Sequence, residues 1–198
     1  RRVERIVREI KRITPAPEIT LSCGEESPEV YRLWRDAGAE RYLLRIETTD
    51  EKLFRALHDA QTHFTARSRA LDDLREAGFV VGTGVMIGLP GQTLDSLAGD
   101  LDFFRQKDCD MIGMGPYLPQ ADTPLGKDFT DSSQARRERL ELALNMIAVT
   151  RLMLRDVNIA AAVSFIGLTT FVLSAVGLKV GNIFGLKYKS KAEFVGKA

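Results

Sequence analysis

The segment FVVGTGVMIGLPGQT (Phe79–Thr93) decides the fold of this 198-residue chain. Its first part, Phe79–Ile87, is apolar and β-branched apart from its glycines, as is typical of a strand. A glycine-rich turn follows, and Thr93 can cap a helix whose leucines share one face. A strand, a turn and a helix in this order predict one βα unit of a parallel sheet.

The same pattern recurs along the chain. Helical periodicity at 3–13 comes first and ends at prolines, and further helices are expected at 28–37, 50–57, 66–77, 94–104 and 133–154. The segments with strand composition are Glu18–Leu21, Arg41–Glu47, Phe79–Ile87 and Asp110–Tyr117. The chain is therefore predicted to be α/β, with about four βα units in an open sheet or a barrel. Polar groups at the carboxyl ends of the strands are the first place to look for a site.

Composition restricts the classes of function. The net charge is +1, from 28 basic and 27 acidic residues, so no charge excess suggests a nucleic-acid partner. Cys23 and Cys109 match no zinc or cluster spacing, and we expect two reduced thiols and no metal site. The first residues lack the apolar region of a signal peptide and an initiator methionine. We therefore expect a cytoplasmic domain whose sequence begins inside a longer protein.

The glycines of the opening segment allow more than one interpretation. Gly82, Gly84 and Gly88 give G-x-G-x-x-x-G, which departs from the dinucleotide fingerprint and places two glycines inside the strand. The absence of G-K-[ST] excludes a P-loop. The glycines could serve a bend or close packing, or they could leave bare backbone against which a flat ligand lies.

Polar residues also end two other strands. Arg45 and Glu47 lie two positions apart on one face of a strand, where they could hold a zwitterionic amino-acid group. A plain salt bridge is the simpler interpretation. The first strand ends in SCGEES, which brings Cys23 and Glu25 near the same edge of the sheet. His58 and His63 do not have the spacing of a metal pair on a helix, so we interpret both as incidental.

Five motifs together resemble a known family. They are TLSCGE, YRLWRDAGAERYLLRIET, GFVVGTGVMIGLPGQT, DMIGMGPYLPQADTPL and LNMIAVTRLMLRDVNIA. In order and spacing they resemble the radical S-adenosylmethionine (SAM) maturase of [FeFe]-hydrogenase of the biotin-synthase-like type, over residues of about 1–159. Biotin synthase and methylornithine synthase are relatives of that family and remain the alternative.

The resemblance implies a partial TIM-type barrel that binds S-adenosylmethionine at the carboxyl ends of its strands. It assigns Arg45 and Glu47 to the methionine end of the cofactor, and Arg67 to the cofactor's carboxylate. The residues that it places along the adenosyl group are Gly84, Met86, Ile87 and Gly88. In this family a [4Fe–4S] cluster cleaves the cofactor reductively, and the resulting radical attacks a small substrate. Other hydrogenase maturation proteins would be the partners.

The chain also departs from the family. The cysteine motif C-x₃-C-x₂-C that holds the cluster is absent, and Cys23 and Cys109 cannot replace it. The segment PQADTP lacks the histidine that the family carries in PHPDTP. We therefore expect a chain that has walls of the cofactor site and cannot cleave the cofactor by itself.

The C-terminal region has a different character. No charged residue occurs in the 22 residues from Val157 to Leu178, which is enough for one membrane-spanning helix. Lysines follow, which favours a cytoplasmic C-terminus.

A buried barrel strand followed by a helix is the alternative to a membrane helix in this region. Residues of about 160–198 resemble a manganese efflux pump family. We predict a chimera of a barrel part, 1–156, and a tail, 157–198, that could insert into a membrane; a non-catalytic chimera or a membrane transport fragment are the alternative functions.

Overall fold

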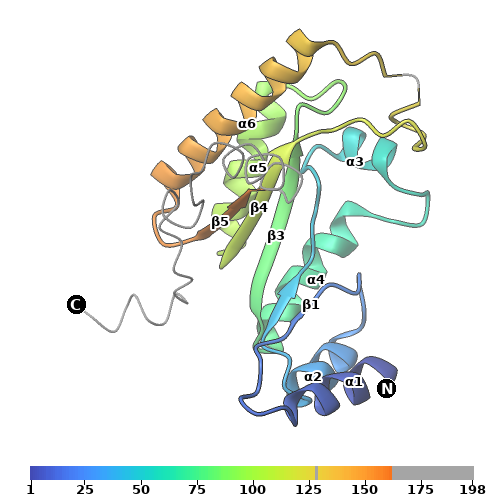
Figure 1. Ribbon diagram of the computed structural model, residues 1–198, viewed down its shortest axis with the longest axis vertical. Helices are drawn as coiled ribbons and strands as arrows, with labels where there is room; N and C mark the ends of the chain where they lie inside the picture. Colours follow the sequence, from blue (N-terminus) through green and yellow to red (C-terminus); the bar gives the residue numbers. More distant parts are fainter. Residues whose placement is uncertain (128, 162–198) are drawn as a thin grey trace, which may run out of the picture. The chain divides into compact units, whose positions relative to one another are not determined.

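The computed structural model describes residues 1–127 and 129–161 (Figure 1). Strands and helices alternate along most of the chain. The strands are β1 (Thr20–Leu21), β2 (Arg41–Leu43), β3 (Val80–Ile87), β4 (Met111–Pro116) and β5 (Asn158–Ala161). The helices are α1 (Arg2–Lys11), α2 (Pro28–Asp36), α3 (Glu51–Leu57), α4 (Phe64–Glu76), α5 (Leu94–Gln106) and α6 (Ser133–Met153).

The strands form one sheet in the order β1-β2-β3-β4-β5. β2 pairs with β1 and with β3 in parallel, and the register places Arg41 opposite Thr20 and Val80. This confirms the predicted α/β class and the parallel sheet. β3 is buried along most of its length. β2 is shorter than predicted, although the chain continues beside β3 as far as an isolated bridge between Glu47 and Val85.

The chain divides into two compact units. The first unit contains 1–85 and 93–112, and the second contains 86–92 and the chain from residue 113 on. The division crosses both β3 and β4. Each unit is described below by itself.

Aromatic side chains from α2, β2 and the residue just before β3 form one part of the core of the first unit. The ring of Tyr42 on β2 lies edge-on to Tyr31 at 5.4 Å and to Phe79 at 5.6 Å, and stacks on Trp34 at 6.1 Å. α2 carries two of these rings and packs against α1 and α4 (Figure 1). Aromatic pairs of this geometry stabilise a core beyond the area they bury. The hydroxyls of Tyr31 and Tyr42 also accept from backbone N–H groups of the loop after β1.

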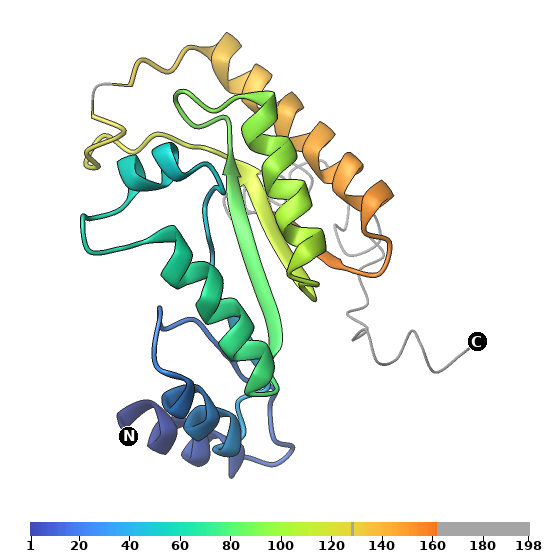
Figure 2. The ribbon, with the colours of Figure 1, turned by 180° about the vertical axis from the view of Figure 1, so that it is seen from behind.

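α4 and α5 cover one face of the strands of the first unit, the face that is turned toward the viewer in Figure 2. α5 begins with a capping box, in which the hydroxyl of Thr93 accepts from the backbone N–H of Ser96 and the Ser96 hydroxyl accepts from Thr93 in return. The predicted cap is thus confirmed. Gly82 of β3 lets neighbouring side chains pack closely, because an added Cβ would meet the terminal methyl of Met111 at 2.7 Å and Leu43 at 3.2 Å.

The second unit contains the end of β3, the end of β4, α6 and β5. The backbone N–H of Tyr117, just after β4, donates to the carbonyl of Ile87 at 2.7 Å. Arg139 on α6 is buried against Gly88, where an added Cβ would meet its Cγ at 2.6 Å. The positive φ of Gly88, 79°, also requires glycine.

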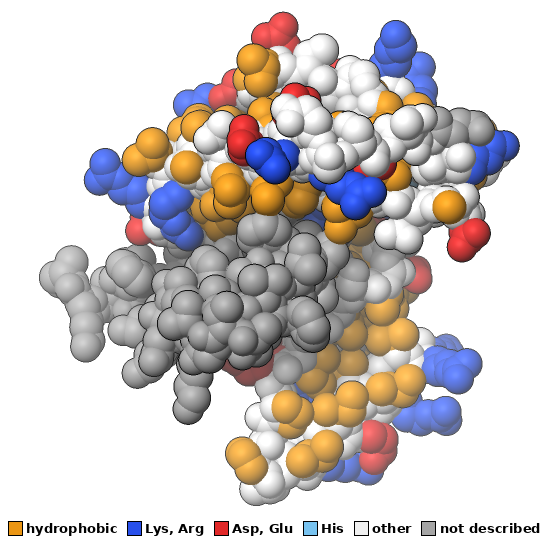
Figure 3. All heavy atoms as spheres, turned by 45° about the horizontal axis from the view of Figure 1, so that its top comes forward, with side chains coloured by type: hydrophobic (Ala, Val, Ile, Leu, Met, Phe, Trp, Pro, Cys, Tyr) orange, Lys and Arg blue, Asp and Glu red, His pale blue; other side chains and the backbone are white. Residues whose placement is uncertain are grey.

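The prediction of an apolar helix from Val157 onward is wrong at its start. Residues Asn158–Ala161 form β5, because they continue the sheet beside β4. Residues 162–178 of the uncharged run lie outside the described residues. Within 1–127 and 129–161, no helix is both long enough and apolar enough to cross a membrane. The surface in Figure 3 shows basic and acidic side chains close to one another, as the balanced charge predicts.

Candidate binding site at the carboxyl end of β2

The backbone is strained where the chain leaves β2. The N–H groups of Ile46 and Glu47 both donate to the carbonyl of Gly84, at 3.1 and 2.9 Å. Glu47 then adopts a φ of 61°, and the N–H of Thr48 donates back to the carbonyl of Ile46 at 2.8 Å. A positive φ is uncommon for glutamate and costs about 1–3 kcal/mol. Strain of this kind clusters at functional sites, where the surrounding structure maintains it.

Arg45 and Glu47 form a two-point ion pair. The Nε of Arg45 donates to Oε1 of Glu47 at 2.8 Å, and its Nη2 donates to Oε2 at 2.9 Å. Nη2 also donates to the carbonyl of Val85 on β3 at 3.0 Å. The side chains are 31% and 20% exposed, so the pair is shielded more than an ordinary surface salt bridge. The positive φ of Glu47 and its ion pair with Arg45 therefore occur together at the end of β2.

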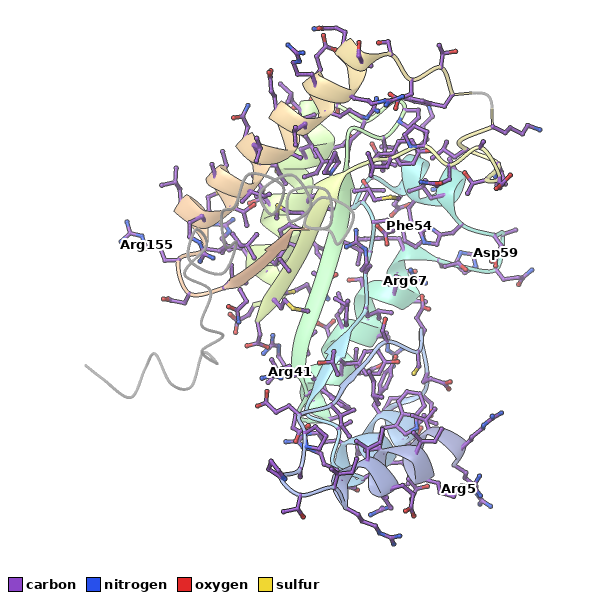
Figure 4. All side chains as sticks on the ribbon, viewed as in Figure 1. Arg5, Arg41, Phe54, Asp59, Arg67 and Arg155 are labelled. Carbon is purple, nitrogen blue, oxygen red and sulfur yellow. The ribbon has the colours of Figure 1, made fainter. Side chains whose placement is uncertain are left out.

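Arg67 joins this pair from the first turn of α4. Its Nη1 donates to the backbone carbonyl of Arg45 at 3.0 Å. On its other edge, Nε and Nη2 donate to the two oxygens of Glu25 at 2.5 and 3.0 Å. The guanidinium lies over the ring of Phe54, 5.8 Å from its centre (Figure 4). The structure thus brings Arg45, Glu47 and Arg67 into one cluster, and their cofactor-binding roles stay a prediction.

His58 belongs to the same cluster, although its spacing suggested no role. Its ring stacks on Phe54 with the centroids 4.0 Å apart. Nδ1 lies 2.9 Å from the Phe54 carbonyl, and Nε2 lies 3.3 Å from Nη1 of Arg67. His58 was not predicted as a site residue, because its spacing from His63 fits no metal pair on a helix. The aromatic residue four positions before it, on the same helical face, was the available signal. His63, in contrast, precedes α4 and makes no side-chain cap bond.

α5 anchors the turn that follows Glu47. Asp100 accepts from the N–H and the hydroxyl of Thr49 through Oδ1, both at 2.7 Å. Asp50 caps α3 and accepts from the Ser96 hydroxyl at 2.9 Å. Asp100 is fully buried and its Oδ2 has no hydrogen-bond partner. Burial raises the pKa of Asp100 to about 6, against the lowering effect of the Thr49 hydrogen bonds.

The remaining predicted residues continue along β3 and its turn. Gly84, in the first unit, accepts both hydrogen bonds from the end of β2. In the second unit, the Gln92 side chain accepts from the N–H of Gly88 at 2.7 Å and donates to the carbonyl of Met86 at 3.0 Å. Ile87 is fully buried. Gln92 therefore satisfies the backbone of this turn internally, which explains much of the GLPGQT motif (Gly88–Thr93).

The donor set at β2 fits one part of the expected cofactor. Guanidinium groups bind carboxylates and carboxylates accept from ammonium groups, so the site matches the ends of an amino acid. The cysteines do not fit a cluster. Cys23 is exposed on the loop after β1, whereas Cys109 is buried and burial raises the pKa of its thiol to about 12. Among 1–127 and 129–161, no group of three or more His, Cys, Asp or Glu side chains could hold a metal.

Comparison with known proteins assigns two parts of the chain. The family model described as "Radical SAM superfamily" matches residues 1–104, and the one described as "Putative manganese efflux pump" matches residues 144–198. The second match begins inside α6, ahead of the predicted boundary at 156/157. That boundary remains a prediction.

Individual relatives agree with this assignment. The chain is 45% identical to the [FeFe] hydrogenase maturase subunit HydE of Thermotoga maritima over 79% of this chain and 42% of that protein. It is 58% identical to the protein described as "Putative manganese efflux pump MntP" of Acetivibrio thermocellus over 21% of each chain. The chain therefore spans about two fifths of HydE and one fifth of MntP.

A third relative and two solved structures extend the comparison. The 3-methylornithine synthase of Methanosarcina barkeri is 32% identical over 70% of this chain and 37% of its own length. The crystal structure of methylornithine synthase (PylB) has a TM-score of 0.65 at 22% identity, and covers 98% of this chain and 65% of that one. The crystal structure of HydG, a maturase of the [FeFe]-hydrogenase, has a TM-score of 0.63 at 16% identity, and covers 79% of this chain and 36% of that one. These likenesses show a shared TIM-barrel-like fold. The chain belongs to the radical SAM superfamily, and joins a part similar to HydE to a C-terminal part similar to MntP.

Proposed function

We propose that this chain forms the S-adenosylmethionine-binding wall of a radical SAM enzyme in [FeFe]-hydrogenase maturation. The observation that carries the proposal is the line of charged groups at the carboxyl end of β2. Two arginine–glutamate pairs are linked there, because Arg67 donates to the backbone carbonyl of Arg45. The 45% identity to HydE supports the biological assignment.

Each residue has a distinct proposed role. Glu47 accepts from the amino group of the cofactor's methionine end, and Arg45 fixes the direction of its carboxylate. Arg67 offers its guanidinium to the cofactor's carboxylate. Gly84, Met86, Ile87 and Gly88 stay predicted contacts of the adenosyl group. When bound, the cofactor supplies a radical on reductive cleavage by a [4Fe–4S] cluster, and the 198 residues contain no C-x₃-C-x₂-C motif for that cluster.

The test compares ligand binding to the full chain and to Glu47→Gln. Calorimetric titration with S-adenosylmethionine should show that the variant binds at least about tenfold more weakly, since a hydrogen bond between charged groups is worth about 1.5–3 kcal/mol. Methylthioadenosine lacks the amino and carboxylate groups, so its affinity should not change. Glu29→Gln removes a carboxylate of an exposed pair on α2 and serves as the matched control. Equal affinity of wild type and Glu47→Gln for S-adenosylmethionine would refute the assignment.

The alternative is a methylornithine-synthase-like activity on another small substrate. The 32% identity to 3-methylornithine synthase supports it less than the HydE similarity supports maturation. Both alternatives share the proposed cofactor site. Partnership with other hydrogenase maturation proteins follows only from the first.

For the C-terminal part we infer a membrane contact, because residues 144–198 match an efflux pump family and residues 157–178 carry no charge. Flotation of the full chain with phospholipid vesicles tests this. Leu168→Arg places a charge within the uncharged run and should abolish flotation. Absence of flotation by the wild-type chain would refute the contact.

A further inference from the structure

The guanidinium of Arg67 has two edges with different surroundings. Nη1 is bound by groups of the first unit's interior, the Arg45 carbonyl and His58. Nε and Nη2 are bound by Glu25, and this pair is partly exposed to solvent. All three nitrogens are therefore engaged before any ligand arrives. A ligand carboxylate can bind Arg67 through two points only if it replaces one of these partners.

The Nη1 edge is fixed. A backbone carbonyl can only accept, so Nδ1 of His58 carries the proton that it donates to Phe54. Nε2 then has a free lone pair and accepts from Nη1 of Arg67. The ring of His58 is stacked on Phe54, which is fully buried and also lies beneath Arg67. The tautomer, the stacking and the carbonyl together hold this edge in one position.

The Glu25 edge is open to exchange. The Glu25 side chain is 30% exposed, against 16% for Arg67. The backbone around it is held, because the hydroxyl of Tyr42 accepts from the N–H of Cys23 at 3.2 Å and the hydroxyl of Tyr31 accepts from the N–H of Glu26 at 2.9 Å. Rotation of the Glu25 side chain toward solvent therefore requires no movement of the loop. Burial raises the pKa of Glu25, and the Arg67 hydrogen bonds and charge outweigh this and lower it, so the group is a carboxylate.

Building on the proposed function, we propose that Glu25 is a specificity-determining residue that competes with the ligand's carboxylate for Arg67. The ligand carboxylate takes the Nε–Nη2 edge and Glu25 turns into solvent. A carboxylate-bearing ligand thus gains only the difference between two similar ion pairs. Ligands without a carboxylate leave Glu25 in place. When an amino acid leaves the site, Glu25 returns to Arg67 and prevents an unpaired charge.

Glu25→Gln tests the proposal in the full chain. Removing the competing charge should tighten the binding of S-adenosylmethionine by about fivefold, the upper range for a partly exposed ion pair. The affinity for methylthioadenosine should stay unchanged, because it does not reach Arg67. Glu29→Gln on α2 is the matched control and should change neither affinity. Glu25→Asp keeps the charge on a shorter side chain and should give an intermediate gain.

The possible results separate the two proposals. Weaker or unchanged binding of S-adenosylmethionine by Glu25→Gln would overturn the competition, since Glu25 would then position Arg67 or be uninvolved. A change in the affinity for methylthioadenosine would also overturn it, by showing a general effect on the site. If the wild-type chain binds neither ligand, the proposed function fails first. If Glu47→Gln behaves as expected and Glu25→Gln does not, only this inference fails.

Discussion

Arg67 in the first compact unit and Arg139 in the second make the same kinds of contact in different surroundings. Each donates to a backbone carbonyl, pairs with a carboxylate and lies over a phenylalanine ring. The ring centre is 5.8 Å away for Arg67 and 5.3 Å for Arg139. The Arg139 side chain is 8% exposed and its partner Asp131 17%, about half the values for Arg67 and Glu25.

The comparison teaches that burial of the ion pair, more than the kinds of partner, determines whether an arginine contributes to packing or keeps a carboxylate partner that can be exchanged. The stem of Arg139 fills the space that a side chain at Gly88 would need, so it is part of the packing. Arg67 meets Glu25 at the surface, where the carboxylate can be exchanged at small cost. A guanidinium buried with its partner supports the fold, whereas one with an exposed partner can serve a ligand.

The largest expected effect is a difference in the free energy of unfolding that is lost when each arginine is replaced. Arg139→Met should lower the free energy of unfolding by about 3 kcal/mol, because it removes buried hydrogen bonds and leaves the Tyr117 carbonyl without its donor. Arg67→Met should cost less, about 1–2 kcal/mol, because its lost ion pair is partly exposed and the hydrogen bond to the Arg45 carbonyl is the main loss. Urea denaturation of both full-length variants measures the difference. Equal losses would show that the exposure of the carboxylate does not distinguish the pairs.

The second effect concerns α5, which anchors the turn after Glu47 through Asp100. The folded-state pKa of Asp100 is raised to about 6, above the unfolded value of about 3.9. The folded state therefore binds the proton more tightly, and the contribution of Asp100 to stability falls as pH rises from about 4 to about 6. The full penalty of about 3 kcal/mol applies above that range.

Asp100→Asn removes this titration and keeps an oxygen that can accept from Thr49. Relative to wild type, the variant should gain about 3 kcal/mol between pH 4 and pH 7. Denaturant midpoints of both proteins over this range measure the relative gain. Asp102→Asn on the exposed face of α5 is the control and should show no comparable trend. If the stability of wild type and of Asp100→Asn changed with pH in the same way, the raised pKa of the buried Asp100 carboxyl would be contradicted.

The elements of the fold were largely predictable, because periodicity and capping are local. Thr93 caps α5 as expected, and β3 ends at Ile87 as predicted. β5 was missed because an apolar run has no period that separates a buried strand from a membrane helix. The strand was the alternative that the sequence left open.

The site was less predictable from the residues alone. Arg45 and Glu47 are neighbours in sequence, and their pairing was one of the two interpretations considered. The partners Glu25 and Arg67 are 42 positions apart, and their contact depends on how the loops after β1 and before α4 meet. The role of Asp100 also depends on three-dimensional packing, since it binds the backbone N–H of Thr49, which is 51 positions away. The resemblance supplied the role of Arg67, whereas its internal carboxylate partner is visible only in the structure.

The smallest expected effect isolates the strain at Glu47, which has no counterpart among the Arg139 contacts. Glu47→Ala and Glu47→Gly both remove the carboxylate that pairs with Arg45, so their difference reports the backbone alone. At a φ of 61°, glycine should be more stable than alanine by about 1 kcal/mol. At Lys52, exposed within α3, the same pair should differ by a similar amount in the opposite sense. Thermal melts of the four variants make the comparison. If alanine matched glycine at position 47, the backbone would relax without the ion pair, and the Arg45–Glu47 pair would then be the cause of the strained turn.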